Sequence, residues 1–89
     1  MTFKDENVEA FKELSKEIKP LIRVQKGCIY LEILQDISNP NIFFSYSHWQ
    51  KEDNLEQYRR SDFFNDVWPK TKQWFAENPE AWSLTNTDI

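Results

Sequence analysis

The stretch Asn41–Phe64 constrains the fold most, because a strand pattern passes directly into a helix pattern within it. Residues Ile42–Trp49 are rich in aromatic and β-branched side chains and contain no Gly or Pro, which predicts a strand. The segment Lys51–Arg60 then has acidic residues in its first turn, where the helix dipole favours them. The junction therefore places His48 and Trp49 at the end of a strand and beside the start of a helix.

A second strand is predicted upstream, at Cys28–Asp36. The turn residues of Ser38–Asn41 separate it from Ile42–Trp49, so the two strands should form an antiparallel hairpin. Neither strand alternates cleanly between apolar and polar side chains, which indicates that both faces of the hairpin are covered. We expect helices on one face and a second copy of the chain on the other.

Two amphipathic helical patterns flank this hairpin. The first has apolar residues at helical spacing from Val8 to Ile18, and Pro20 should kink or end the helix. The second follows the capping residue Ser61, and there Pro69 either kinks the helix or starts a new one. Its apolar stripe consists of Phe64, Val67, Trp68, Thr71 and Phe75.

The two ends of the chain complete the expected sheet. Met1–Lys4 reads as a strand stub with Phe3 buried, and Ala81–Thr85 reads as a last strand. The tail Asn86–Ile89 is expected to fray. This order of elements predicts a single α+β domain over residues 1–89, a ferredoxin-like antiparallel sheet with helices on one face. Because aromatic residues make up 16% of so short a chain, we expect a homodimer that hides the excess apolar surface.

Composition excludes several classes of function. The net charge of −4 and the scattered basic residues argue against nucleic acid or an anionic membrane as a partner. One Cys (Cys28) and one His (His48) leave no disulfide framework and make a protein-only metal site improbable. Gly27 is the only glycine, so Gly-rich cofactor loops are excluded, and we expect no cofactor. No signal peptide or membrane-spanning run is found, and the expected compartment is the cytoplasm.

The sequence resembles the antibiotic biosynthesis monooxygenase family from about Phe3 to Leu84. The resemblance is carried by LEILQDISNPNIFFSYSHWQKEDNLEQYRRSDFF, which follows Gly27 and Cys28, and by AWS at Ala81–Ser83. It implies a dimeric α+β barrel of two ferredoxin-like subunits, each with an apolar pocket between its sheet and its helices. Members of the family include cofactor-independent monooxygenases that oxidise polycyclic phenols, quinol-oxidising enzymes and heme-degrading enzymes.

The resemblance disfavours heme degradation for this chain. Heme-degrading members use an Asn on the first strand, an aromatic residue on the helix after the Trp-ended strand, and an iron-binding His ten residues later. Tyr58 matches the aromatic position, but Trp68 occupies the position of the iron ligand, and Met1–Lys4 contains no Asn. An indole cannot bind iron as an imidazole does.

The resemblance and the residue inventory together indicate a site. His48 is a candidate proton acceptor because imidazole exchanges protons near neutral pH, although a strand-end histidine hydrogen-bonded to a neighbour is an equally ordinary role. Glu32 either pairs with an Arg or a partner-chain Lys, or is an exposed glutamate. The catalytic candidates are His48, Tyr58 and Arg59, with Tyr58 or Arg59 stabilising a substrate anion. The substrate-binding candidates are Trp49, Phe63, Trp68 and Trp74, which could stack on a flat ring or belong to the core.

Two hypotheses of function follow. In the first, the chain is a monooxygenase that oxidises a small electron-rich phenol or quinol with O2 and without a cofactor. In the second, it is a dimeric small-molecule-binding or regulatory module without turnover. An isomerase-like proton shuttle would use the same groups. A cavity that reaches His48 would favour an enzyme, whereas filling by Trp68 and Trp74 would favour a structural role.

Overall fold

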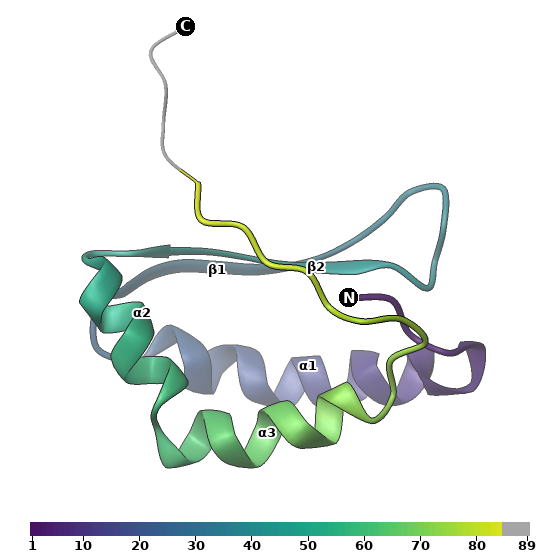
Figure 1. The fold of residues 1–89 in the computed structure, drawn as a ribbon, viewed down its shortest axis with the longest axis horizontal. Coiled ribbons are helices and arrows are strands. Elements are labelled where there is room, and N and C mark those ends of the chain that lie inside the picture. The colour runs from purple at the N-terminus through teal and green to yellow at the C-terminus, as the bar shows by residue number, and fades with distance from the viewer. Residues whose placement is uncertain (85–89) are drawn as a thin grey trace, which may run out of the picture.

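The structure is a computed structural model that describes residues 1–84. Figure 1 shows an antiparallel hairpin with the α-helices packed on one side of it, and the chain after the last helix returning across the strands. This arrangement confirms the predicted α+β class. The elements in chain order are the 3-10 helix η1 (Asp5–Asn7), α1 (Val8–Arg23), β1 (Cys28–Gln35), β2 (Phe43–Trp49), α2 (Glu52–Arg59) and α3 (Asp62–Lys72).

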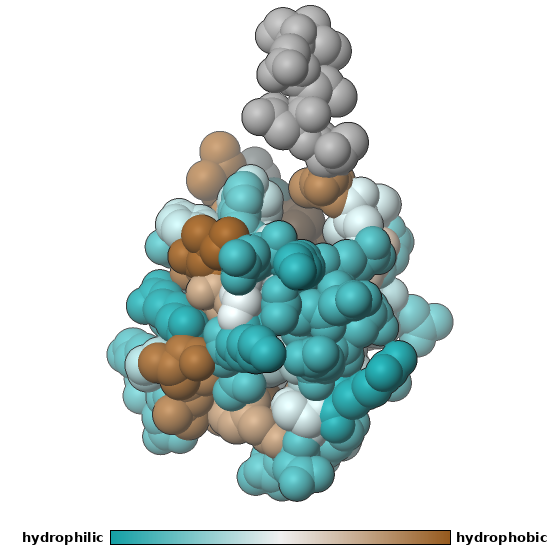
Figure 2. Space-filling view, turned by 90° about the vertical axis from the view of Figure 1, so that its left-hand side faces the viewer, coloured by the Kyte–Doolittle hydropathy of each residue, from teal (hydrophilic) through white to brown (hydrophobic). Residues whose placement is uncertain are grey.

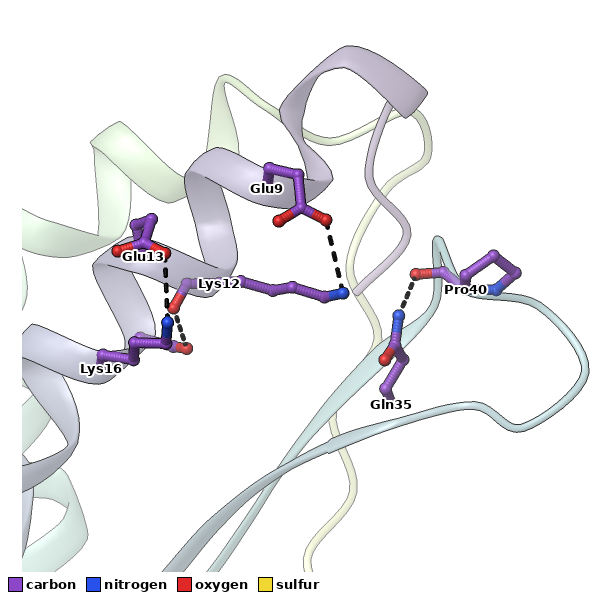
Figure 3. Close-up of polar contacts among 7 residues, drawn as sticks. Glu9, Lys12, Glu13, Lys16, Gln35 and Pro40 are labelled. Carbon is purple, nitrogen blue, oxygen red and sulfur yellow. Dashed lines mark hydrogen bonds and ion pairs between the residues drawn. The ribbon is translucent and has the colours of Figure 1, made fainter.

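The hairpin of β1 and β2 has the antiparallel register that its turn predicts. Tyr30 lies opposite His48 and Leu34 lies opposite Phe44, with an irregularity between Cys28 and Tyr30. The Gln35 amide donates a hydrogen bond to the carbonyl of Pro40 at 2.8 Å and so braces the connecting loop (Figure 3).

The N-terminal stub extends this sheet, as predicted. Thr2 forms an antiparallel bridge to Ile42, and Phe3 forms one to Phe75. The Phe3 amide donates to the Asn41 carbonyl at 2.8 Å, and the Ala76 amide donates to the Thr2 carbonyl at 2.7 Å. The stub therefore lies between the start of β2 and the segment that follows α3.

The prediction of a last strand at Ala81–Thr85 is wrong for residues 81–84. Residues 81–84 are not in a strand, and Thr85 and the tail Asn86–Ile89 lie outside the described residues. Phe75 pairs with the stub instead, because its ring packs edge-on against the buried ring of Phe3 at 5.0 Å between centroids.

Both prolines lie inside helices. Pro20 does not end α1, which continues to Arg23, and Pro69 does not start a new helix, because α3 runs through it to Lys72. Burial favours these continuations: Ile22 is 7% exposed and Thr71 is 4% exposed, so the turns beyond each proline pack into the interior. This packing outweighs the hydrogen bond that each proline removes.

The core consists of two clusters on the helix-facing side of the sheet. Phe3, Phe11 and Phe43 form the first, and Ile18, Ile22 and Leu31 form the second. The outward side of α1 is polar, and Figure 3 shows its ion pairs at a spacing of three residues. These join Glu9 to Lys12 and Glu13 to Lys16.

The opposite face of the sheet is open in the single chain. Its large apolar side chains are between 41% and 46% exposed: Tyr30, Leu34, Phe44 and Tyr46. The predicted helical cover of one face is thus confirmed, and the other face carries an apolar surface. Among the described residues, no helix is both long enough and apolar enough to cross a membrane.

Candidate functional site

The junction between β2 and α2 is fixed by backbone contacts with the turn before β1. The Gln50 amide donates to the Gly27 carbonyl at 2.7 Å, and the Lys51 amide donates to Asn54 Oδ1 at 3.1 Å. Gly27 has a φ of 82°, and a Cβ added to it would lie 2.3 Å from Asn54 Cγ. Only glycine fits this approach, so Gly27 allows α2 to dock on the start of β1.

An aromatic group lies between the sheet and the helices at this junction. Trp49 and Tyr58 stack with centroids 5.3 Å apart and an angle of 25° between the ring planes. Tyr58 also contacts Phe64 edge-on at 5.2 Å and Phe63 at 6.4 Å. The indole nitrogen of Trp49 donates to Ser47 Oγ at 3.0 Å, which fixes its orientation. We call Trp49, Tyr58, Phe63 and Phe64 the helix-side aromatic cluster.

The phenol of Tyr58 is half-buried in this cluster. Burial, with a smaller contribution from the neighbouring Cys28 thiol, raises the pKa of Tyr58 to about 12. The hydroxyl is protonated at neutral pH, as it would be at the ordinary tyrosine pKa, and it can donate a hydrogen bond. Burial likewise raises the pKa of Cys28. The chemistry available on this side is hydrogen-bond donation to an anion and stacking on a flat ring.

Trp68 and Trp74 are half-buried and pack against other aromatic or core side chains. Trp68 stacks on Phe64 at 5.8 Å and meets Phe75 edge-on at 5.7 Å. Trp74 packs against the first core cluster. Trp68 thereby extends the helix-side aromatic cluster through Phe64, whereas Trp74 lies beside the first core cluster, away from that aromatic cluster.

His48 lies on the open face of the sheet. Its Nε2 is hydrogen-bonded to Tyr46 Oη at 2.8 Å, and its ring meets those of Tyr46 and Tyr30 nearly at right angles. Desolvation, followed by the nearby Glu32 carboxylate, raises the pKa of Tyr30. The three rings form a polar aromatic group that we call the open-face group.

The sequence-predicted catalytic residues do not meet in one protomer. His48 and Tyr58 are on opposite faces of the sheet, because His48 points away from the helices while its neighbour Trp49 points toward them. Arg59 is half-exposed and pairs with Glu56 at 3.2 Å. The structure brings together Trp49, Tyr58 and Phe63, and it separates them from His48, Arg59 and Trp74.

Two surface depressions lie near these groups, and His48 lines neither. The larger, of about 260 Å³, runs along the outer edge of β1, where Arg23 Nη2 lies 3.9 Å from Glu32 Oε1. This contact agrees with the predicted partner for Glu32, although both side chains are largely exposed. The smaller, of about 100 Å³, lies between the turn before β1 and α2 and is lined by Gln25, Lys26, Asn54, Gln57 and Tyr58.

Sequence reasoning missed Asn54 and the role of Gly27. The available signal was a lone glycine before a strand, together with an asparagine in the first turn of the next helix. Their contact depends on tertiary packing. No cluster of three or more His, Cys, Asp or Glu side chains suited to a metal occurs within residues 1–84.

Comparisons with known proteins agree with this architecture. A family model described as antibiotic biosynthesis monooxygenase matches residues 1–69. A conserved protein from Methanosarcina mazei Go1 superposes with a TM-score of 0.84 at 29% identity, covering 89% of this chain and 78% of that one. No match was found among curated protein sequences.

Two further solved structures share the fold. A candidate antibiotic biosynthesis monooxygenase from Nitrosomonas europaea has a TM-score of 0.80 at 21% identity, covering 86% of this chain and 74% of that one. Another from Deinococcus radiodurans has a TM-score of 0.76 at 17% identity, covering 96% and 92%.

Proposed function

Because the chain belongs to the antibiotic biosynthesis monooxygenase family, we propose that it oxidises a small electron-rich phenol or quinol with O2 and without a cofactor. The observation that carries this proposal is the stacking of Trp49 on Tyr58, whose half-buried phenol has a pKa raised to about 12. A flat ring binds well to aromatic walls, and a protonated phenol donates to the anion that such a ring becomes.

The reaction requires little of the protein. The substrate loses a proton, and its anion gives one electron to O2, after which the two radicals combine at the reacting carbon. Where that carbon is a CH2 group, both its hydrogens leave, one oxygen atom becomes the carbonyl oxygen, and the other leaves as water. The proposed role of Tyr58 is to donate a hydrogen bond to the anion. Trp49, Phe63 and Trp68 are proposed to hold the ring and exclude water.

The reaction also needs a group that accepts the proton that the substrate loses. The four residues of the helix-side aromatic cluster include no carboxylate or imidazole, so the cluster itself supplies no proton acceptor. His48 is proposed as acceptor only if substrate instead binds on the open face, where Tyr46 orients the imidazole. The exposed Arg59, paired with Glu56, is the weaker candidate for holding the anion.

We also propose a homodimer in which the open faces of two sheets cover each other. The half-exposed rings and Leu34 on that face favour association, because contact with a second copy removes their apolar surface from water. The same contact would enclose the open-face group.

Oxygen consumption with a trihydroxyanthracene-type substrate tests the proposal. We expect Tyr58→Phe and Trp68→Ala to lower the rate about tenfold or more, since a donor or a wall is lost, while Lys72→Met serves as the control. If His48→Ala is the only variant that consumes oxygen more slowly, the reaction takes place on the open face. Equal rates in the wild type and in Tyr58→Phe, Trp68→Ala and His48→Ala would remove these role assignments.

A binding module without turnover is the second candidate. It is favoured by the packing of Trp68 on Phe64 and of Trp74 against the first core cluster, and by the two depressions, which do not reach His48. Saturable quenching of tryptophan fluorescence by the same aromatic compound, with no oxygen consumed, would support this candidate over the enzyme.

A further inference from the structure

The smaller depression, of about 100 Å³, combines five side chains that can all donate hydrogen bonds and none that is acidic. It lies at the end of the molecule formed by α2 and the turn before β1, the end that faces the viewer in Figure 2. The surface there is largely hydrophilic. The lining side chains are Gln25, Lys26, Asn54, Gln57 and Tyr58.

Asn54 is the informative member of this set. It is 9% exposed, and its Oδ1 accepts from the Lys51 amide, which fixes which side of the carboxamide is oxygen and which is nitrogen. Its Cγ is held against Gly27, so the amide group cannot turn freely. No hydrogen bond to Asn54 Nδ2 is found among residues 1–84. Since no buried side-chain nitrogen or oxygen of the described residues lacks a partner, this amide nitrogen reaches solvent, and a ligand in the depression can accept a hydrogen bond from it.

The other donors are mostly free as well. Within the described part of the chain, Lys26 has no carboxylate within ion-pair distance, and the Gln57 side chain has no hydrogen-bond partner. Gln25 Nε2 is already engaged with the Leu21 carbonyl. The Tyr58 hydroxyl is protonated at neutral pH and can donate as well.

We propose that this depression binds a small oxyanion of the carboxylate class, with Lys26 supplying the charge and Asn54 Nδ2 a hydrogen bond from a side chain that is held in place. Its volume of about 100 Å³ corresponds to a carboxylate with one or two carbons attached, alone or as the acid end of a longer ligand. Two carboxylate oxygens can accept from several donors at once, which suits a site with an ammonium group and amides. The binding does not depend on oxygen chemistry.

Two-dimensional NMR of the labelled full chain tests the proposal without an activity assay. Sodium acetate is titrated at constant ionic strength against sodium chloride, and the side-chain amide signals of Asn54 and Gln57 are followed. We expect saturable shifts with acetate and none with chloride. Formate and inorganic phosphate, titrated in the same way, establish whether the site prefers a planar carboxylate.

Asn54→Asp is the decisive variant, because it keeps the oxygen that accepts from Lys51 but replaces the free donor by a negative oxygen. We expect it to weaken acetate binding about tenfold or more, and Lys26→Met to weaken it several-fold. Lys72→Met, an equal loss of charge on α3, should bind as the wild type does. Unsaturated shifts in the wild type, or wild-type binding by Asn54→Asp and Lys26→Met, would overturn the proposal.

Discussion

The indole ring of Trp49, the last residue of β2, lies nearly parallel to the phenol ring of Tyr58 in α2, with 5.3 Å between the ring centroids. The strand and the helix that follows it are thus joined by a stacked pair as well as by the short turn between them. The pair is fixed at one end by the hydrogen bond from Trp49 to Ser47. It connects the sheet to the second core cluster, against which Tyr58 packs.

The stack should be measurable as a coupling between the two residues. We expect Trp49→Leu and Tyr58→Leu each to lower the free energy of unfolding, and the double variant to lose about 1 kcal/mol less than the sum. Urea denaturation of the four proteins measures this difference. Exposed Trp82, changed to Leu, should show no coupling to Tyr58; additive losses for Trp49 and Tyr58 would contradict a stabilising stack.

Gly27 should tolerate no side chain. Alanine there would adopt a positive φ of 82° and place its Cβ 2.3 Å from Asn54 Cγ, so both strain and a steric clash oppose it. We expect Gly27→Ala to lower the free energy of unfolding by about 2 kcal/mol or more. The urea midpoint measures the loss. Adding Asn54→Gly to the Gly27→Ala variant should recover part of the lost stability. An unchanged midpoint would show that the turn can rearrange.

The hairpin and the helix faces followed from the sequence because local chemistry specifies them. Turn residues between two aromatic-rich runs predict the hairpin, and apolar spacing predicts the helical faces. The sequence left two alternatives open at each proline because the cost of a proline is local, whereas the burial of Ile22 and Thr71 beyond them, which favours a continuous helix, depends on the whole fold. The last strand was misplaced because Phe75, next to Phe3, competes with the later segment for the stub.

The candidate site was predicted in part. The sequence placed Trp49, Tyr58 and Phe63 among the candidate site residues, and the structure brings these three rings together. Adjacent residues of a strand point to opposite faces, so the separation of His48 from Trp49 was already implied by their positions. The contact between Asn54 and Gly27 was not accessible, because residues far apart in sequence meet there only through packing.

The raised pKa of Tyr58 predicts a loss of stability in strong base. The folded chain holds the phenol proton up to about pH 12, whereas the unfolded chain loses it near its ordinary value of about 10. Between these values the folded state binds more protons, so the free energy of unfolding falls as pH rises, and by less than about 1.4 kcal/mol per pH unit because solvent screens the partly exposed phenol. Below about pH 10 the phenol is protonated in both states and contributes no pH dependence.

Urea denaturation across this range measures the slope, and Tyr58→Phe should reduce it because the titrating group is gone. Tyr46→Phe, an equal loss of one hydroxyl on the open face, should leave the contribution of Tyr58 in place. If the wild type and Tyr58→Phe lose stability equally between pH 10 and 12, the phenol is not shielded as its burial implies.

Ser61 should contribute to stability as the cap of α3. Its Oγ accepts from the Phe64 amide at 3.1 Å and donates to the Tyr58 carbonyl at 2.6 Å, which joins the end of α2 to the start of α3. We expect Ser61→Ala to lower the free energy of unfolding by about 1 kcal/mol, and Ser61→Thr to retain most of it. Thermal unfolding followed by circular dichroism distinguishes the two, and equal losses would rule out a capping role.

The proposed dimer predicts that one charge on the open face separates the subunits. Phe44 is 45% exposed opposite Leu34, so Phe44→Glu should cost the single chain little but bury a carboxylate in the interface. Light scattering should report twice the 10.8 kDa chain mass for the wild type and one chain mass for the variant. Gln73→Glu adds the same charge at the end of α3 and should stay dimeric. A wild type that is monomeric at micromolar concentration would refute this interface, because its apolar face would then be stable in water without a second copy.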